Sequence, residues 1–189
     1  MFIQILTQFT NIPAWHNIYS LTHMSRILFH HKIKTVTAGV LGTSVMTLFS
    51  YFLSTIVKDD VKEPKLLGKM IHRLLPGVSR TNSRISGWVV HYAVGLLFAE
   101  LYIQLWEKTK VKPNYKTGFI LGGFSGIAAI LIWKITLKLH PVPPSVNFKK
   151  HALNLFFAHV VFGLFAVVGY SWYELQTLLN KFCEPIAAP

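Results

Sequence analysis

The sequence contains one cysteine, Cys183, and only seven acidic residues among its 189. A single thiol excludes an internal disulfide, a cysteine-based zinc site and an iron–sulfur cluster within this chain. Acids are also too few for catalysis by paired carboxylates. We find no glycine loop that binds phosphate, no H-E-x-x-H helix and no nucleophile elbow. The chain therefore carries no recognisable enzyme signature, and we predict neither catalytic residues nor a metal site.

The scarcity of acids leaves a formal net charge of +12. Such a charge is compatible with nucleic-acid binding, but no nucleic-acid motif accompanies it. The lysines and arginines lie almost wholly between hydrophobic runs, where anionic lipid headgroups attract them. We therefore expect a lipid bilayer with anionic headgroups as the partner, and no nucleic acid.

Hydrophobic residues make up 52% of the chain, which is more than an ordinary soluble domain contains. They gather in four runs that are long enough to cross a hydrocarbon core as helices. The predicted spans are about 35–57, 85–106, 117–139 and 152–173. The chain is thus expected to be an all-α, multi-pass integral membrane protein.

Two segments flank this predicted transmembrane domain, which covers 35–173. Residues 1–34 are mixed in character, show no signal-peptide pattern and are expected to be soluble or interfacial. The sequence of this segment is compatible with a translation start at Met1 or at Met24. Residues 174–189 form a predicted C-terminal tail.

The connection between the first two spans contains a predicted amphipathic helix. Apolar residues recur at helical spacing between Lys65 and Leu75, opposite a basic face, and Pro76-Gly77 ends the pattern. This spacing favours a helix that lies in the membrane interface, and a helix that docks on a protein is the alternative.

Lysines and arginines number eight on the side of the N-terminus and ten on the opposite side, which gives only a weak preference for a cytoplasmic 58–84 connection.

Similar phrases in the second and fourth spans indicate an internal repeat. His91 begins His-Tyr-Ala-Val-Gly and His159 begins His-Val-Val-Phe-Gly, each followed by Phe-Ala. Spans 1 and 3 also carry small residues on one face. We therefore predict two similar helical hairpins, 1–2 and 3–4, related as a parallel repeat. Glycines at four-residue spacing, such as Gly118, Gly122 and Gly126, predict close helix packing.

The paired histidines are the main functional candidates, because imidazoles are rare in membrane spans. Both are expected to enter from the same side of the membrane at similar depth. The first interpretation is that each imidazole only hydrogen-bonds to a neighbouring helix and holds the bundle together. Two functional alternatives remain beside it.

One alternative is a haem b electron carrier. In it His91 and His159 ligate the iron from opposite faces, and Gly95 and Gly163 make room for the ring. Arg84 and Lys149 would then meet the haem propionates.

The other alternative is a proton or solute path through a transporter or channel component. It is formed by His91, His159 and Lys134, with Glu100 at its far end. Because four spans are few for a self-contained transporter, a homodimer or a larger membrane complex is plausible.

Three phrases resemble small bacterial inner-membrane proteins of the YagU type. They are Gly42–Phe49 (GTSVMTLF), His91–Gly95 (HYAVG) and His159–Gly163 (HVVFG). The resemblance covers the four spans and excludes the first 30 residues. It implies a four-span inner-membrane protein linked to acid or envelope stress, and it brings no catalytic residue with it.

Overall fold

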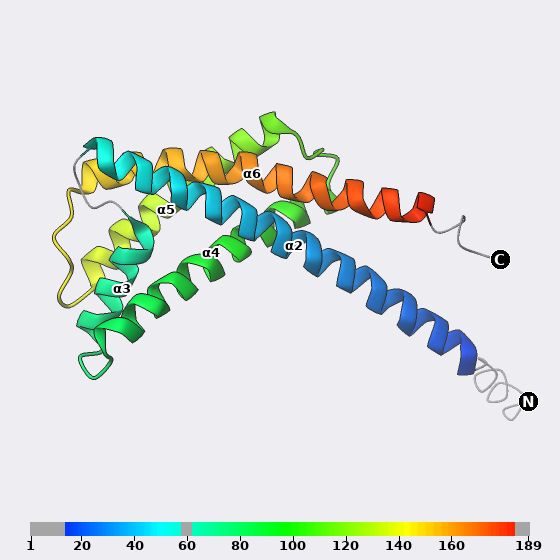
Figure 1. The fold of residues 1–189 in the computed structure, drawn as a ribbon, viewed down its shortest axis with the longest axis horizontal. Coiled ribbons are helices and arrows are strands. Elements are labelled where there is room, and N and C mark those ends of the chain that lie inside the picture. Colours follow the sequence, from blue (N-terminus) through cyan, green and yellow to red (C-terminus); the bar gives the residue numbers. More distant parts are fainter. Residues whose placement is uncertain (1–13, 58–61, 184–189) are drawn as a thin grey trace, which may run out of the picture. The chain divides into compact units, whose positions relative to one another are not determined.

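The computed structural model describes residues 14–57 and 62–183. This part of the chain contains helices and no strand (Figure 1). The helices are α2 (Ala14–Val57), α3 (Glu63–Leu74), α4 (Arg80–Lys108), α5 (Tyr115–Leu139) and α6 (Phe148–Cys183). The all-helical fold predicted from the sequence is therefore confirmed. The predicted tail 174–189 continues α6 up to Cys183, and its last residues lie outside the described part.

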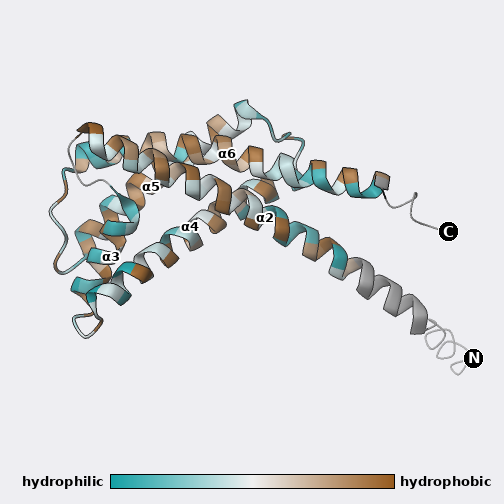
Figure 2. Cartoon of the chain, viewed as in Figure 1, coloured by the Kyte–Doolittle hydropathy of each residue, from teal (hydrophilic) through white to brown (hydrophobic). Residues whose placement is uncertain are grey.

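Within the described residues, four helices are long and apolar enough to cross a membrane, in agreement with the four predicted spans. The candidate spans are Met24–Val57, Arg80–Lys108, Tyr115–Leu139 and Phe148–Phe182. Large apolar side chains on their outer faces are exposed, and Figure 2 shows the hydrophobic colouring along them. Examples are Leu97 and Leu101 on α4 and Phe124 and Leu131 on α5, each more than half exposed. Such surfaces suit lipid better than water.

The chain divides into residues 1–33 and residues 34–189. In the first unit the described residues form the beginning of α2, and the side chains of 24–30 are exposed. The sequence left residues 1–34 without a predicted helix, whereas residues 14–34 are helical. The second unit contains the remaining helices and the candidate site.

Local signals explain where the helices of the second unit begin. The Ser79 side chain accepts a hydrogen bond from the backbone N–H of Asn82 at the start of α4. Asn114 and Thr117 form a capping box at the start of α5. Pro64 occupies the first turn of α3, where its missing N–H leaves no helical hydrogen bond unmade.

Helices α5 and α6 pack closely along a face of small residues. A Cβ atom on Gly122 would lie 2.5 Å from the carbonyl oxygen of His159, and one on Gly118 would lie 2.7 Å from that of Gly163. A Cβ atom on Gly163 would in turn collide with the Gly118 carbonyl oxygen. These glycines let the two backbones touch, so the packing role predicted for them is confirmed.

Helix α2 packs against both α4 and α6. A Cβ on Gly39 would lie 3.1 Å from the Leu96 backbone of α4, and one on Gly42 would lie 2.9 Å from the Phe162 ring of α6. Phe162 is almost fully buried and joins aromatic and small residues of α2, α4 and α6 in one core. That core fixes the helices on which the paired histidines lie.

The predicted amphipathic helix exists as α3, and it packs on the protein. Its Leu66 and Met70 are buried with Trp133 of α5 and Leu155 of α6. A Cβ on Gly87 of α4 would collide with the Pro64 carbonyl and lie 2.6 Å from the Gly68 nitrogen. The apolar face of α3 is therefore buried against other helices of this chain, while Lys65, Lys69 and Arg73 are exposed.

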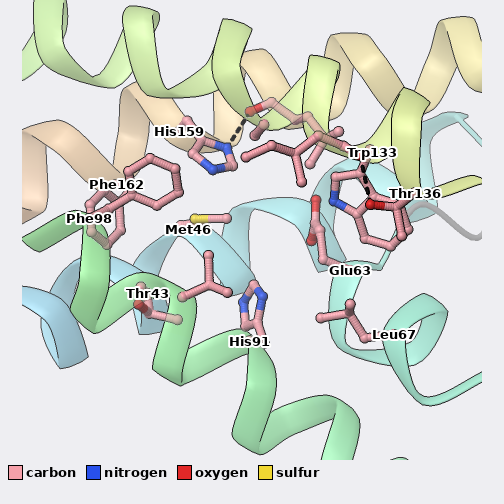
Figure 3. A pocket seen from close by; sticks show the side chains of 15 residues that line it. Thr43, Met46, Glu63, Leu67, His91, Phe98, Trp133, Thr136, His159 and Phe162 are labelled. Atoms are coloured by element: carbon pink, nitrogen blue, oxygen red, sulfur yellow. Dashed lines mark hydrogen bonds between the residues drawn. The ribbon is translucent and has the colours of Figure 1, made fainter. Parts of the chain in front are cut away.

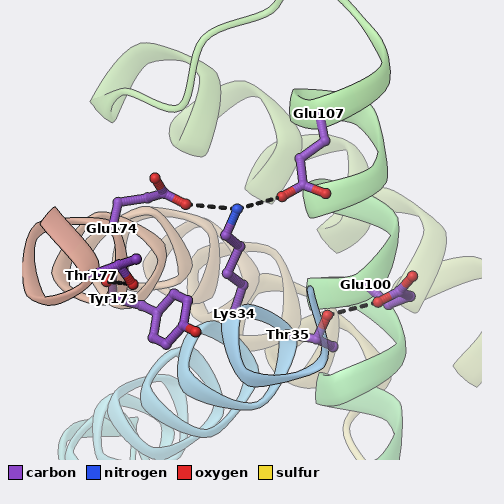
Figure 4. Close-up of polar contacts among 7 residues, drawn as sticks. All are labelled: Lys34, Thr35, Glu100, Glu107, Tyr173, Glu174 and Thr177. Carbon is purple, nitrogen blue, oxygen red and sulfur yellow. Dashed lines mark hydrogen bonds and ion pairs between the residues drawn. The ribbon is translucent and has the colours of Figure 1, made fainter. Parts of the chain in front are cut away.

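Polar contacts join α2, α4 and α6 at the other end of the bundle (Figure 4). The Lys34 ammonium forms ion pairs with Glu107, at 2.8 Å, and with Glu174, at 2.6 Å. Next to them Glu100 accepts hydrogen bonds from Thr35, at 2.7 Å, and from Gln104, at 2.6 Å. These bonds join α2, α4 and α6 at the end of the bundle that is distant from α3.

Candidate functional site

The structure brings His91 and His159 together at one cavity (Figure 3). Each lies eleven residues after the first residue of its helix, Arg80 or Phe148. The two rings point toward each other from opposite sides, and the Met46 side chain lies between them. Both imidazoles are buried, with exposed fractions of 6% and 5%.

The cavity also receives a carboxyl group, from Glu63 at the start of α3. Its Oε1 accepts a 2.6 Å hydrogen bond from Asn154 Nδ2 and a 3.3 Å bond from Ser50 Oγ. Its Oε2 is buried and has no hydrogen-bond partner among the residues that the structure describes. Burial raises the pKa of Glu63 to about 7, although hydrogen bonds from its own backbone, Ser50 and Asn154 oppose the shift.

The rest of the cavity wall is mostly apolar and aromatic. Phe98, Trp133 and Phe162 contribute rings, and Met46 and Leu155 contribute aliphatic surface. The cavity volume is about 130 Å³, close to that of engineered cavities that bind benzene. A small cavity with a few converging polar groups is the usual form of a ligand site.

A haem is far larger than this cavity, and the two glycines do not provide space for it. The Cβ position of Gly95 is filled by Thr43 of α2, and that of Gly163 by the backbone of α5. Arg84 and Lys149 are exposed and do not line the cavity. Of the residues predicted to surround a haem, Gly95 and Gly163 serve helix packing, and Arg84 and Lys149 face outward.

Only part of the predicted proton path is assembled at the cavity. Lys134 is exposed on α5, one position after buried Trp133, and does not line the cavity. Glu100 lies with Thr35 and Gln104, nine residues beyond His91 on α4, and does not line the cavity either. The histidines therefore share their cavity with Glu63 and not with these two residues.

Glu63 is the functional candidate that the sequence analysis missed. It lies in the connection between two spans, whereas the predicted site residues came from ionisable residues inside or next to the spans. A local signal existed, because Glu63-Pro64 is a typical first turn of a helix and precedes the amphipathic pattern. That signal places the residue on a helix, but its burial depends on the packing of α3 against α4, α5 and α6.

A second buried polar group lies behind the cavity, at the start of α6. His151 is fully buried, and neither of its ring nitrogens has a hydrogen-bond partner. Its ring meets Trp133 edge-on, with centroids 4.8 Å apart. Asn154 and Ser50 are also fully buried close by. This half of the bundle is thus polar inside. Among the described residues no group of three histidine, cysteine, aspartate or glutamate side chains is arranged to hold a metal ion.

Comparison of the chain with protein-family models, with curated proteins and with solved structures finds no match.

Proposed function

We propose that this chain is a small multi-pass protein of the bacterial inner membrane, without catalytic chemistry, whose internal cavity couples solute binding to protonation. One observation carries the proposal: Glu63, His91 and His159, from three different helices, line the same cavity. Burial brings the pKa of Glu63 to about 7, and the imidazoles beside it are side chains that often serve as proton shuttles.

The proposal includes the finer points of the predicted architecture. It takes the four spans as two similar hairpins, with α3 at the headgroup level where its exposed lysines meet anionic lipids. It also takes the resemblance to the YagU type as support for a role in acid or envelope stress. Since four spans enclose only a small cavity, the proposed working form is a homodimer or a component of a larger complex.

The proposal is tested by the fluorescence of Trp133, which lies in the cavity wall. Purified protein in lipid nanodiscs should show a pH-dependent change in emission centred near pH 7, the pKa of Glu63. The change should disappear in Glu63→Gln and also in Trp133→Phe, which identifies the reporter.

Glu174→Gln is the matched control, because Glu174 lies in the ion-pair cluster and not at the cavity. That variant should keep the transition. An unchanged transition in Glu63→Gln, or a flat pH profile in the wild-type protein, would contradict the proposal.

A further inference from the structure

The hydrogen bonds around the cavity determine which kind of atom each ionisable group offers to a ligand. The clearest case is Glu63, whose Oε1 already has two donors while Oε2 has none. In Figure 3 the carboxyl group lies in the cavity between Met46 and Trp133. A buried acceptor without a donor is costly, and a ligand that brings a donor would remove that cost.

His159 offers a second acceptor. Its Nδ1 lies 2.8 Å from the Leu155 carbonyl oxygen, and a carbonyl oxygen can only accept. In the neutral ring Nδ1 therefore carries the proton, and Nε2 keeps its lone pair. Figure 3 shows the ring directed toward Met46 and the cavity.

His91 offers a third acceptor, for a related reason. Its Nε2 lies 2.9 Å from the Thr47 hydroxyl. That hydroxyl donates its only proton to the Thr43 carbonyl oxygen, at 2.6 Å. The hydroxyl must then accept from His91, so the neutral ring is protonated at Nε2 and its Nδ1 keeps the lone pair.

We propose that the cavity binds a small protonated amine, either ammonium or a short primary alkylammonium ion. It would donate N–H hydrogen bonds to Oε2 of Glu63 and to the unprotonated nitrogen of His159 or His91, which lie on opposite sides of Met46. The inference rests on the proposed function, because it names the solute of the same cavity. A primary ammonium group has three donors and no acceptor, which suits a cavity whose ionisable groups offer acceptor atoms. Its alkyl part suits the aromatic and aliphatic wall, and the rings of Phe98 and Phe162 favour a cation nearby.

The size and composition of the site favour an amine over a metal ion. The volume of about 130 Å³ leaves room for a few heavy atoms beyond the charged group. A metal ion would need several ligands at short range, and the described residues contain no such group of three histidine, cysteine or acidic side chains. A single carboxylate also matches the single charge of an ammonium ion.

Isothermal titration calorimetry of the full-length protein in nanodiscs at neutral pH tests the inference. The probes are ammonium chloride and ethylammonium chloride, compared with tetramethylammonium chloride, which has the charge but no N–H donor. We expect saturable binding of ammonium or ethylammonium and affinity for tetramethylammonium lower by about 10- to 100-fold, as for loss of hydrogen bonds to a charged group. Glu63→Gln should weaken binding by a similar factor, and Glu174→Gln should not change it.

The comparison of the three salts needs no variant, so it decides the question even if Glu63→Gln does not fold. Equal binding of tetramethylammonium, or binding of zinc or copper(I) ions in place of the amines, would overturn the inference. Absence of amine binding together with a Trp133 transition that depends on Glu63 would also overturn it, while leaving the proposed function intact. Amine binding without that transition would contradict the proposed coupling to protonation instead.

Discussion

The stability of the folded protein should depend on pH through one buried carboxyl group, that of Glu63. The group is fully enclosed by protein, and its pKa lies near 7 instead of the ordinary 4.5. In the folded protein it therefore keeps its proton at pH values where the unfolded chain has already lost it. Stability should be highest at low pH and should fall as the pH rises from about 4.5 to about 7.

The Glu63→Gln variant should lose this dependence. Over the window between the two pKa values the wild-type protein should lose on the order of 3 kcal/mol relative to the variant. Thermal unfolding in detergent, followed by circular dichroism at a series of pH values, measures the difference. Parallel curves for the two proteins would show that the carboxyl group is not buried as described.

The residue scale also shows what the sequence could and could not predict about the site. The pair His91 and His159 was recognisable, because two imidazoles in apolar runs are rare. Lys134, a member of the alternative proton path, is exposed next to buried Trp133, and its position near a span end did not determine which way it faces. Glu63 could not be placed, because its burial requires contacts with residues far away in the sequence.

At the scale of elements, the four spans were predictable because hydropathy and length determine them. Their extents were underestimated, since α2 and α6 continue past the apolar runs into polar sequence. The period of α3 was also predictable, but its docking was not. That docking depends on a close contact between Gly68 and Gly87, and the sequence alone does not show that these two glycines meet.

The contact between Gly68 and Gly87 provides a direct test of how α3 is held. In Gly87→Ala the new methyl group would collide with the Pro64 carbonyl oxygen. We expect α3 to separate from α4, with a loss of about 1–3 kcal/mol, which is typical of overpacking. Trypsin should then cleave faster at Lys65, Lys69 and Arg73.

Gly77→Ala is the control, because no atom lies within 4 Å of the added Cβ. Its trypsin pattern should match that of the wild-type protein. Equal cleavage rates for Gly87→Ala and Gly77→Ala would contradict the close contact between α3 and α4.

At the scale of the whole molecule, the two ends of the bundle differ in charge. Exposed lysines and arginines gather where α3 meets the start of α4, the end of α5 and the start of α6, and the described acid at this end, Glu63, is buried. The exposed basic residues are Lys65, Lys69, Arg73, Arg80, Arg84, Lys138, Lys149 and Lys150. At the opposite end Lys108, Lys110, Lys112, Lys116 and Lys181 are exposed as well, but Glu107 and Glu174 accompany them and pair with Lys34. Since basic segments stay in the cytoplasm, the small excess of positive charge beside α3 gives a weak preference for a cytoplasmic α3.

The orientation can be measured with the native thiol. Cys183 ends α6, whose first turns pack against α3 through Leu155. If α3 is cytoplasmic, a membrane-impermeant maleimide should label Cys183 in cells with a permeable outer layer. The double variant Cys183→Ser, Lys69→Cys should be labelled only after lysis. The reverse pattern would place α3 on the outer side.

The acid of the cavity belongs to α3, which at 12 residues is too short to cross a bilayer. A membrane-spanning helix is fixed in depth by the lipid around it, whereas α3 is held by contacts such as the 3.0 Å bond between His140 Nε2 and the Met70 carbonyl oxygen. Displacement of α3 would therefore remove a wall of the cavity and its negative charge in the same movement. Opening of the cavity and release of its ligand would then be one event. A bound cation would lose the wall that blocks its exit and the carboxylate that attracts it at the same time.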